Sequence, residues 1–334
     1  MGVTNSLKKK FEKIKKEISK AKRILILTHR APDGDAIGSV LSLGLFLKRK
    51  KKKPYIYALQ LPQSLSFLPG FAQIKKKLLQ DNFDLIFILD CPRKDRLEVP
   101  QDFSINPQKV ISIDHHLKQG QFGNINIIVP NACSVCEILY WFFNYLGVKI
   151  DKKIATCLLC GIFTDTGGFS WLKKESLKTV RDLIDLKADL PQIARSYNYI
   201  SLPRAKLLAK MIERIEKDEN LNLIYSWLKI SDLKEGKGES IFSEPPVFPD
   251  FLSQIGNADV YLLLLEHKNN KIKANLRSHR NTGKKLKCSV NVAEVAERFG
   301  GGGHKCAAGF KVKGTIPEVL ERVKNELKKL KKRV

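Results

Sequence analysis

The stretch ILILTHRAPDGDAIGS, residues Ile24 to Ser39, joins an apolar run to a polar loop and then to a second apolar pattern. A short continuous apolar run bounded by polar residues is typical of a strand buried on both faces. The loop contains His29, Asp33 and Asp35, which are residue types that bind metals or move protons. The stretch therefore predicts a buried strand that delivers functional side chains to the edge of a sheet.

Similar alternation continues along the first half of the chain. Strands are expected at 24–28, 56–59, 84–89, 109–113 and 124–129, and helices at 36–50, 71–80, 133–147, 151–163 and 174–186. Residues 1–22 read as a charged amphipathic helix with Leu7, Phe11, Ile14 and Ile18 on one face. Apolar strands that alternate with helices indicate an α/β fold with a Rossmann-like parallel sheet covered on both faces. We expect Gly34 to let the first loop turn tightly and Gly38 to admit the helix against the sheet.

The pattern changes after residue 186, where a polar helical segment with two prolines begins. We predict an N-terminal domain over 1–188, a helical connector over 189–218 and a smaller C-terminal α/β domain over 219–334. In the last part we expect strands at 221–229, 258–266 and 271–277, helices at 291–299 and 317–332, and a surface loop or hinge at 234–250.

The chain is strongly basic, with 60 Lys and Arg against 34 Asp and Glu and a formal charge of +26. This excess favours phosphate-rich partners, although lysine runs such as 48–53 are also typical of ordinary solvated faces. We identify no signal peptide and no apolar run of the roughly 20 residues that a membrane-spanning helix needs. The composition predicts a cytoplasmic protein that does not act in a membrane.

Seven cysteines form an odd number in a chain too long to need disulfide staples, so we expect reduced thiols. The pairs Cys133/Cys136 and Cys157/Cys160 have a spacing compatible with a four-thiolate zinc site. Their surroundings are apolar and helix-like, without the glycine or basic turn residues of a zinc knuckle. Both interpretations stay open, and burial as small apolar side chains is the one that the local sequence favours.

Polar side chains follow several apolar runs, where an open parallel sheet gathers its functional groups. His29, Asp33 and Asp35 follow the first strand, Asp90 the third, Asp114, His115 and His116 the fourth, and Asp165 ends the run 154–164. A single aspartate after a strand is often only a helix cap. The repeated pattern instead predicts an oxygen-rich site with imidazole, suited to two Mn²⁺ or similar ions and to hydrolysis of a phosphate ester.

Five motifs in order resemble those of the DHH phosphoesterases: HRAPDGDAIGS, ILDCP, IDHH, GIFTDTGGF and, near the C-terminus, RFGGGGHKCAAGF. The resemblance covers residues 24 to about 310. It implies that two Mn²⁺ ions, with Mg²⁺ or Co²⁺ as alternatives, are held by His29, Asp33, Asp35, Asp90, His115 and Asp165. It also implies that Asp90 and Asp165 bridge the ions, that His116 faces the scissile phosphate, and that Asp114 orients the histidine pair.

The C-terminal motif is similar to the signature of the substrate-binding domain found in that family. Consecutive glycines allow backbone N–H groups to approach an anion closely, although a flexible turn is the simpler alternative. With LRSHR at 276–280, the resemblance implies that substrate contacts come from Arg277, Ser278, Gly301, Gly302, Gly303 and His304.

The two-domain layout resembles the short oligoribonucleases of the DHH family. It implies a phosphodiesterase that hydrolyses very short RNA and dinucleotides to mononucleotides and also removes the 3′ phosphate of 3′-phosphoadenosine 5′-phosphate (PAP). Hydrolysis of cyclic di-AMP or linear dinucleotides is a second enzymatic reading, and a soluble pyrophosphatase fits less well because it lacks the glycine–histidine signature. A non-catalytic RNA-binding protein is the alternative of another class. A homodimer is expected by analogy only.

Overall fold

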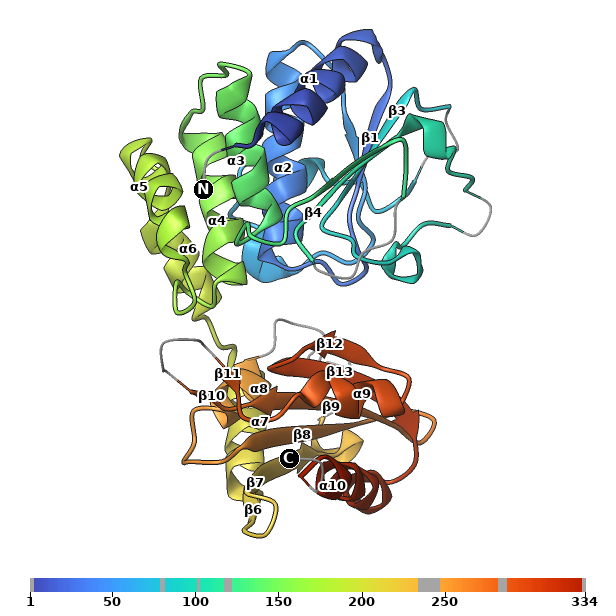
Figure 1. Ribbon diagram of the computed structural model, residues 1–334, viewed down its shortest axis with the longest axis vertical. Coiled ribbons are helices and arrows are strands. Elements are labelled where there is room, and N and C mark those ends of the chain that lie inside the picture. Colours follow the sequence, from blue (N-terminus) through green and yellow to red (C-terminus); the bar gives the residue numbers. More distant parts are fainter. Residues whose placement is uncertain are drawn as a thin grey trace. The chain divides into compact units, whose positions relative to one another are not determined.

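The computed structural model describes residues 3–78, 82–100, 103–116, 122–233, 247–281 and 287–331. The chain divides into two compact units, Met1–Tyr199 and Ile200–Val334, and the boundary falls within the helical connector expected at 189–218 (Figure 1). Each unit has its own hydrophobic core, as expected for separate domains.

The first unit contains a five-stranded sheet in the order β2-β1-β3-β4-β5, and every pairing is parallel. The strands are β1 (Ile24–Leu27), β2 (Tyr55–Ile56), β3 (Leu85–Leu89), β4 (Val110–Asp114) and β5 (Ile125–Ile128). All residues of β1, β3 and β4 are buried, which explains their unbroken apolar sequences. The predicted parallel sheet is confirmed.

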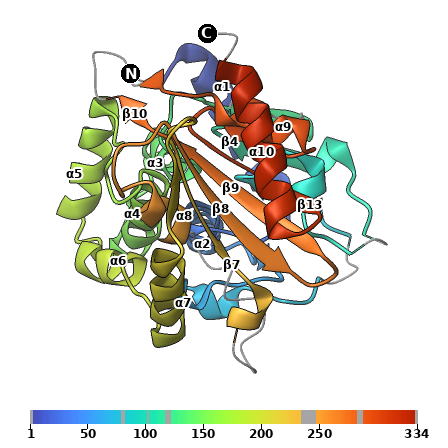
Figure 2. The same ribbon diagram turned by 90° about the horizontal axis from the view of Figure 1, so that it is seen from below.

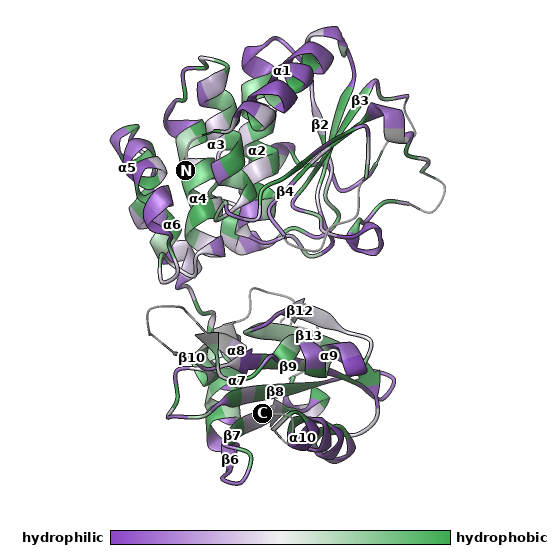
Figure 3. Ribbon diagram, viewed as in Figure 1, coloured by the Kyte–Doolittle hydropathy of each residue, from purple (hydrophilic) through white to green (hydrophobic). Residues whose placement is uncertain are grey.

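Helices form one layer beside this sheet, where Figure 3 shows hydrophobic faces turned toward each other. They are α1 (Asn5–Lys20), α2 (Gly34–Arg49), α3 (Val135–Tyr145) and α4 (Lys152–Asp165), and behind α4 lie α5 (Leu177–Asp185) and α6 (Leu190–Tyr197). The four apolar residues predicted to share one face of α1 are all buried. No helix in the described part of the chain is both long and apolar enough to cross a membrane.

The opposite face of the sheet differs from the prediction. Irregular chain covers it with apolar side chains that include Leu78, Phe83 and Phe103, whereas the 3₁₀ turns at 63–65 and 71–73 contribute Leu65 and Phe71 to the core on the helix side. The helix expected at 71–80 is wrong within the described residues: a 3₁₀ turn spans Phe71–Gln73, Lys75 then pairs with Tyr57 beside β2, and 79–80 lie outside the described residues. Prolines at 92, 100 and 107 disfavour a helix between β3 and β4, whereas residues 71–80 contain no proline.

Close-fitting glycines allow α2 and α4 to pack together. A Cβ atom on Gly34 would lie 2.3 Å from Thr164 Oγ1, and one on Gly38 would lie 2.4 Å from the Cys157 carbonyl oxygen. The predicted roles of these two residues are therefore corrected: Gly34 is the first residue of α2 and Gly38 admits α4, not the sheet. The residue with a left-handed φ in the preceding loop is Ala31, at 52°.

The second unit contains a six-stranded sheet in the order β12-β13-β9-β8-β7-β6, in which only the β7–β8 pairing is parallel. Its strands are β6 (Glu216–Asp218), β7 (Leu223–Leu228), β8 (Val260–His267), β9 (Lys271–Ser278), β12 (Gly302–His304) and β13 (Ala307–Lys313). The helices α9 (Val292–Arg298) and α10 (Ile316–Lys331) cover one face, and α7 (Leu202–Glu213) and α8 (Val247–Leu252) cover the other (Figure 2).

The three strands and two helices predicted in this unit are confirmed to within two residues at the described ends. The loop expected at 234–250 is only partly testable, because 234–246 lie outside the described residues. Its last residues, 247–250, belong to α8, so the prediction is wrong there. The short strands β12 and β13 were not predicted. A small ribbon of β10 (Arg280–Asn281) and β11 (Lys287–Cys288) was also missed.

The cysteines divide into two classes. Cys288 and Cys306 form a disulfide with a Cα–Cα separation of 5.4 Å, which corrects the expectation that all thiols are reduced. The other five are free and buried in the first unit. Burial raises the pKa of the Cys160 thiol to about 12, and that of Cys136 well above its ordinary value. The predicted burial of Cys133, Cys136, Cys157 and Cys160 is confirmed.

Candidate metal centre

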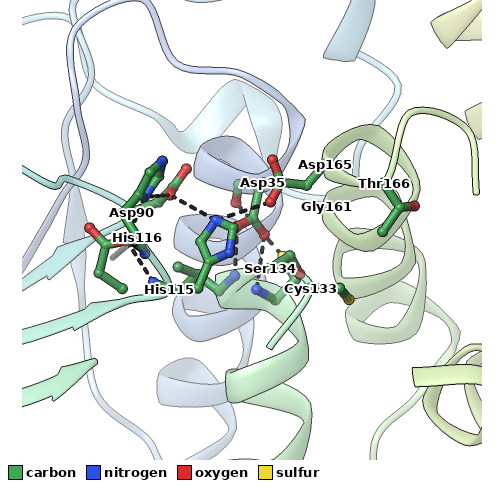
Figure 4. Close-up of polar contacts among 12 residues, drawn as sticks. Asp35, Asp90, His115, His116, Cys133, Ser134, Gly161, Asp165 and Thr166 are labelled. Carbon is green, nitrogen blue, oxygen red and sulfur yellow. Dashed lines mark hydrogen bonds and ion pairs between the residues drawn. The ribbon is translucent and has the colours of Figure 1, made fainter. Parts of the chain in front are cut away.

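The predicted polar residues of the first unit meet at the carboxyl edge of its sheet. Three groups of possible ligands have their atoms within 4.8 Å of one another: Asp90–Asp114–His115–His116, His29–Asp33–Asp90 and Asp35–His115–Asp165. Asp90 and His115 each belong to two groups, so the three form one continuous cluster, most of which is drawn in Figure 4. The structure thus brings all eight residues together.

His29 and Asp90 come from the ends of neighbouring strands β1 and β3. The Nδ1 atom of His29 lies 2.8 Å from the Arg30 carbonyl oxygen and 3.3 Å from an Arg96 guanidinium nitrogen, and Nε2 lies 3.5 Å from Asp90 Oδ2. Asp90 is 2 % exposed and has a left-handed φ of 52°. Its backbone N–H donates to the Ile113 carbonyl at 3.0 Å, which holds this uncommon conformation between β3 and β4.

Asp33 and Asp35 lie at the start of α2. Asp33 is the helix cap, because its Oδ1 accepts hydrogen bonds from the backbone of Asp35 and Ala36 at 3.1 and 3.0 Å. Asp35 is fully buried, and its two oxygens accept from the backbone N–H groups of Val135 and Cys136 at 2.6 and 2.9 Å. The positive end of α3 therefore faces the Asp35 carboxylate.

His115 and His116 follow β4 and face different acids. His115 Nε2 lies 3.0 Å from Asp165 Oδ2, at the last residue of α4, and 3.9 Å from Asp90 Oδ1. Asp114 Oδ1 accepts hydrogen bonds from the backbone N–H groups of both histidines, at 2.6 and 2.9 Å, and lies 2.7 Å from His116 Nδ1. Asp114 thus orients the pair of histidines.

The electrostatics of the cluster show an excess of buried negative charge. Burial, followed by the charges of Asp35 and Asp33, raises the pKa of Asp90 well above its ordinary value. Burial and the charge of Asp165 raise the pKa of Asp35 to about 7. Burial lowers the pKa of His115, but its hydrogen bond to Asp165 and the charge of that residue outweigh this effect and raise the pKa to about 9.

Asp114 behaves differently from the other buried acids. Burial raises its pKa, but the hydrogen bond and charge of His116 outweigh this effect and hold the pKa below the ordinary range. Within the described chain, Asp90 Oδ1 and Asp114 Oδ2 are buried without a hydrogen-bond partner. Crowded carboxylates with unpartnered oxygens and nearby imidazoles fit bound divalent cations, which would supply the missing positive charge.

Sequence reasoning missed the contacts that hold Asp35. The amides of Val135 and Cys136 are free to bind it because α3 begins at Val135, after the cap residue Ser134. The spacing of Ser134 and Glu137 is the S-x-x-E signature of such a helix start, and Ser134 Oγ accepts from the Glu137 amide at 3.1 Å. This signal could have placed the helix start, but not its distance from Asp35.

The predicted substrate residues lie in the second unit, on adjacent strands. Ala307 on β13 pairs with Arg277 on β9 and with His304 on β12, so the three residues form one row across the sheet. Directly paired residues project to the same face of a sheet. Ser278 is buried, and its Oγ accepts from the Val290 amide at 2.9 Å.

The glycines next to this row have conformations that require glycine. Gly300 has a φ of 72° and Gly303 a φ of 149°. A Cβ atom on Gly301 would lie 2.3 Å from the Gly309 carbonyl oxygen, whereas one on Gly302 would meet nothing within 4 Å. The glycine run thus leads from a turn at Gly300 into β12, to which Gly302 and Gly303 belong.

Comparisons with known proteins agree with this architecture. Residues 23–162 match the DHH family, N-terminal domain, and residues 246–332 match the DHHA1 domain. The bifunctional oligoribonuclease and PAP phosphatase NrnA of Thermus thermophilus is 28% identical over 91% of this chain and 90% of its own. A probable enzyme of the same name from Streptococcus mutans is 26% identical, over 95% and 99%. The crystal structure of an exopolyphosphatase-related protein from Bacteroides fragilis is similar with a TM-score of 0.82, at 28% identity and 96% coverage of both chains.

Proposed function

The chain belongs to the DHH family of phosphoesterases, and we propose that it is a Mn²⁺-dependent phosphodiesterase that hydrolyses very short RNA to mononucleotides and also removes the 3′ phosphate of PAP. The observation that carries this proposal is the sharing of Asp90 and His115 among three ligand groups. A cluster with shared members suits a pair of ions, which is the usual apparatus of phosphoester hydrolysis.

We assign the metal ligands as His29, Asp33, Asp35, Asp90, His115 and Asp165. Asp90 is suited to a bridging role because its Oδ2 lies 3.5 Å from His29 and its Oδ1 3.9 Å from His115. Asp165 is the second proposed bridge and is 26 % exposed, so it faces the side open to substrate. When bound, two such ions lower the pKa of a water molecule and neutralise charge on the phosphoryl oxygens.

His116 is the residue that we assign to the substrate phosphate. Its Nδ1 is occupied by Asp114 at 2.7 Å, and its side chain is 25 % exposed. Because Nδ1 is hydrogen-bonded to Asp114, Nε2 is the ring nitrogen that we assign to the phosphate. His116 then stabilises charge on the phosphate and passes a proton to the leaving ribose oxygen, while Asp114 keeps the ring in place.

We propose that the second unit selects the substrate, with residues 1–188 as the catalytic part and 219–334 as the substrate-binding part. The row of Arg277 and His304 offers cationic or donor groups, and Gly302 beside it has nothing within 4 Å of its Cβ position, which leaves room for an anion to approach. The names of the two bacterial relatives, which cite oligoribonuclease and PAP phosphatase activities, support the same substrate class. The charge of +26 fits such acidic substrates.

The test is turnover of 5′-phosphorylated diadenylate, PAP and cyclic diadenylate in parallel by the purified protein with Mn²⁺, with Asp90→Ala as the inactive control. Release of AMP from the linear diadenylate and from PAP, lost in the control, is the expected result. Faster turnover of cyclic diadenylate than of the linear diadenylate would identify cyclic dinucleotides, instead of RNA fragments, as the substrate. Absence of all turnover in a protein that binds Mn²⁺ would overturn the proposal and favour the RNA-binding alternative.

A further inference from the structure

The disulfide lies beside the residues that we assign to substrate binding. Cys306 is in the turn between β12 and β13, two residues after His304, and Cys288 ends β11. Both cysteines are partly exposed, whereas the five thiols of the first unit are buried. A solution-phase thiol or disulfide therefore has access to this pair and not to the others.

Hydrogen bonds from the same turn reach both neighbouring segments. The Ser278 amide donates to the Cys306 carbonyl oxygen at 3.0 Å, and the Val292 amide donates to the Lys305 carbonyl oxygen at 2.9 Å. The Val290 amide donates to Ser278 Oγ at 2.9 Å. The disulfide thus adds a covalent link between the turn and the segment before α9, beside these hydrogen bonds and the β13–β9 pairing that begins at Ala307 and Arg277.

The strand stabilised by this connection is intrinsically weak. β12 has three residues, Gly302–His304, and lies at the edge of the sheet with β13 as its neighbour. Glycine loses more conformational freedom on ordering than any other residue, and the strand follows Gly300 and Gly301. A covalent link two residues beyond His304 reduces the number of conformations that β12 can adopt without substrate. Because less conformational entropy is then lost when substrate binds, the affinity is higher.

We propose that Cys288 and Cys306 are a reversible thiol–disulfide pair that sets substrate affinity, with the disulfide form binding more tightly. This inference rests on the proposed role of β12 in substrate binding. In the reducing direction, a thiolate of an external dithiol attacks one sulfur and the Cys288–Cys306 bond breaks. The second external thiolate then resolves the mixed disulfide. Two electrons and two protons end on the two cysteines, and the external dithiol becomes a disulfide.

The experiment compares the oxidised and the dithiothreitol-reduced full-length protein, with the state of the pair measured by alkylation and mass spectrometry. We expect reduction to raise KM for 5′-phosphorylated diadenylate about 10-fold while kcat stays within about twofold, a coupling of ordinary size. The double variant C288S/C306S, which carries the same five buried thiols, should show the high KM before and after the same treatment. Equal KM in the two forms, with alkylation confirming the change of state, would overturn the proposal.

A readout that needs no turnover separates this inference from the proposed function. Hydrogen exchange of the backbone amides of residues 301–304 should be faster in the reduced protein than in the oxidised protein. If exchange is faster on reduction but the protein has no phosphodiesterase activity, the redox control of β12 is supported and the proposed substrate is rejected. A pair that dithiothreitol does not reduce, or that oxidised glutathione does not re-form, would overturn reversibility. A change in melting temperature without a change in KM or in the exchange of 301–304 would leave only a structural staple and overturn the inference.

Discussion

The Asp35 carboxylate accepts a hydrogen bond from the backbone amide of Val135 over 2.6 Å, although 100 residues of chain separate the two. The contact joins the first turn of α2 to the first turn of α3, and the Cys136 amide donates to the other oxygen. A proposed metal ligand is therefore held by the folded backbone itself, so its position depends on how α2, α3 and α4 pack.

Gly161→Ala tests this dependence. The added Cβ would lie 2.3 Å from Cys136 Sγ and 2.6 Å from Asp35 Oδ1, both of them buried. We expect destabilisation of about 1–3 kcal/mol from overpacking. We also expect a loss of about 10-fold or more in Mn²⁺ affinity, because a group that positions a ligand is disturbed. Urea unfolding and calorimetric titration measure the two effects.

The control for Gly161→Ala is Gly302→Ala, whose Cβ would meet nothing within 4 Å. It should leave both the free energy of unfolding and the Mn²⁺ affinity unchanged, whatever it does to substrate binding. Unaltered Mn²⁺ affinity in Gly161→Ala would show that Asp35 is not held by this packing.

Metal removal should affect stability as well as activity. The cluster contains buried carboxylates whose pKa values are raised in the absence of metal, so bound cations relieve unfavourable charge. We expect chelation to abolish turnover and Mn²⁺ to raise the melting temperature of the first unit in a concentration-dependent way. Asp90→Asn should respond much more weakly to Mn²⁺ in the same thermal scan, and an equal response would exclude Asp90 as a ligand.

His116→Ala should reduce kcat by about 10²–10⁴-fold, the range for removal of a general acid, with Mn²⁺ affinity nearly unchanged. Asp114→Asn should give a smaller loss, of about 10–100-fold, because the imidazole remains and only its orientation and charge support are weakened. Steady-state kinetics with Mn²⁺ titrations on both variants decide this order. If the His116→Ala variant keeps the wild-type kcat, another group must transfer the proton.

Arg277→Ala should raise KM for the diadenylate about 10-fold or more and leave kcat nearly unchanged, because the proposed charge-assisted contact to a terminal phosphate would stabilise the bound substrate and the transition state equally. Arg298→Ala provides the matched control, since that arginine is exposed on α9 and lies outside the row of Arg277 and His304. Equal KM changes in the two variants would indicate a general charge effect.

Asp232 provides a pH-dependent test of stability in the second unit. Its side chain is 6 % exposed and is bound by Arg214 and by Lys210, and the hydrogen bond from Arg214 holds its pKa below the ordinary range. A depressed pKa stabilises the fold above the unfolded value of about 3.9, and this contribution is lost as pH falls below it. We expect Asp232→Asn to lower the free energy of unfolding by about 2 kcal/mol at pH 7.

The difference between Asp232→Asn and the parent protein should shrink as urea unfolding is repeated from pH 5 down to pH 3. Asp185→Asn, at an exposed position of α5, is the control and should change the free energy of unfolding by less than about 0.5 kcal/mol. A pH-independent difference for Asp232→Asn would mean that packing, not charge, accounts for its effect.

The sequence was sufficient to predict the parallel sheet and the gathering of polar side chains at its carboxyl edge, because both depend on local patterns. Continuous apolar runs mark strands buried on both faces, and the carboxyl ends of parallel strands share one edge. His29, Asp90 and His115 could therefore be grouped from their positions at the ends of successive apolar runs, and the structure places them in one cluster.

Features that depend on distant segments could not be predicted in the same way. Residues 71–80 have an apolar pattern compatible with a helix, but in the described part of this range a 3₁₀ turn spans Phe71–Gln73 and Lys75 pairs with Tyr57 beside β2. Cys288 and Cys306 meet only because β12 and β13 form a hairpin, and neither strand was recognised. The hydrogen bonds of Asp35 to α3 also cross 100 residues, beyond the reach of any local rule.

The close contact of α2 with α4 has a mechanical consequence for the metal centre. Asp35 is the second residue of α2 and Asp165 the last residue of α4, so each is mounted on the end of a packed helix. The two helices are in such close contact that a Cβ atom would not fit at Gly34, Gly38 or Gly161. The packing of α2 against α4 therefore sets the spacing of the two carboxylates, so a substitution at this helix contact would change the distance between two proposed metal ligands.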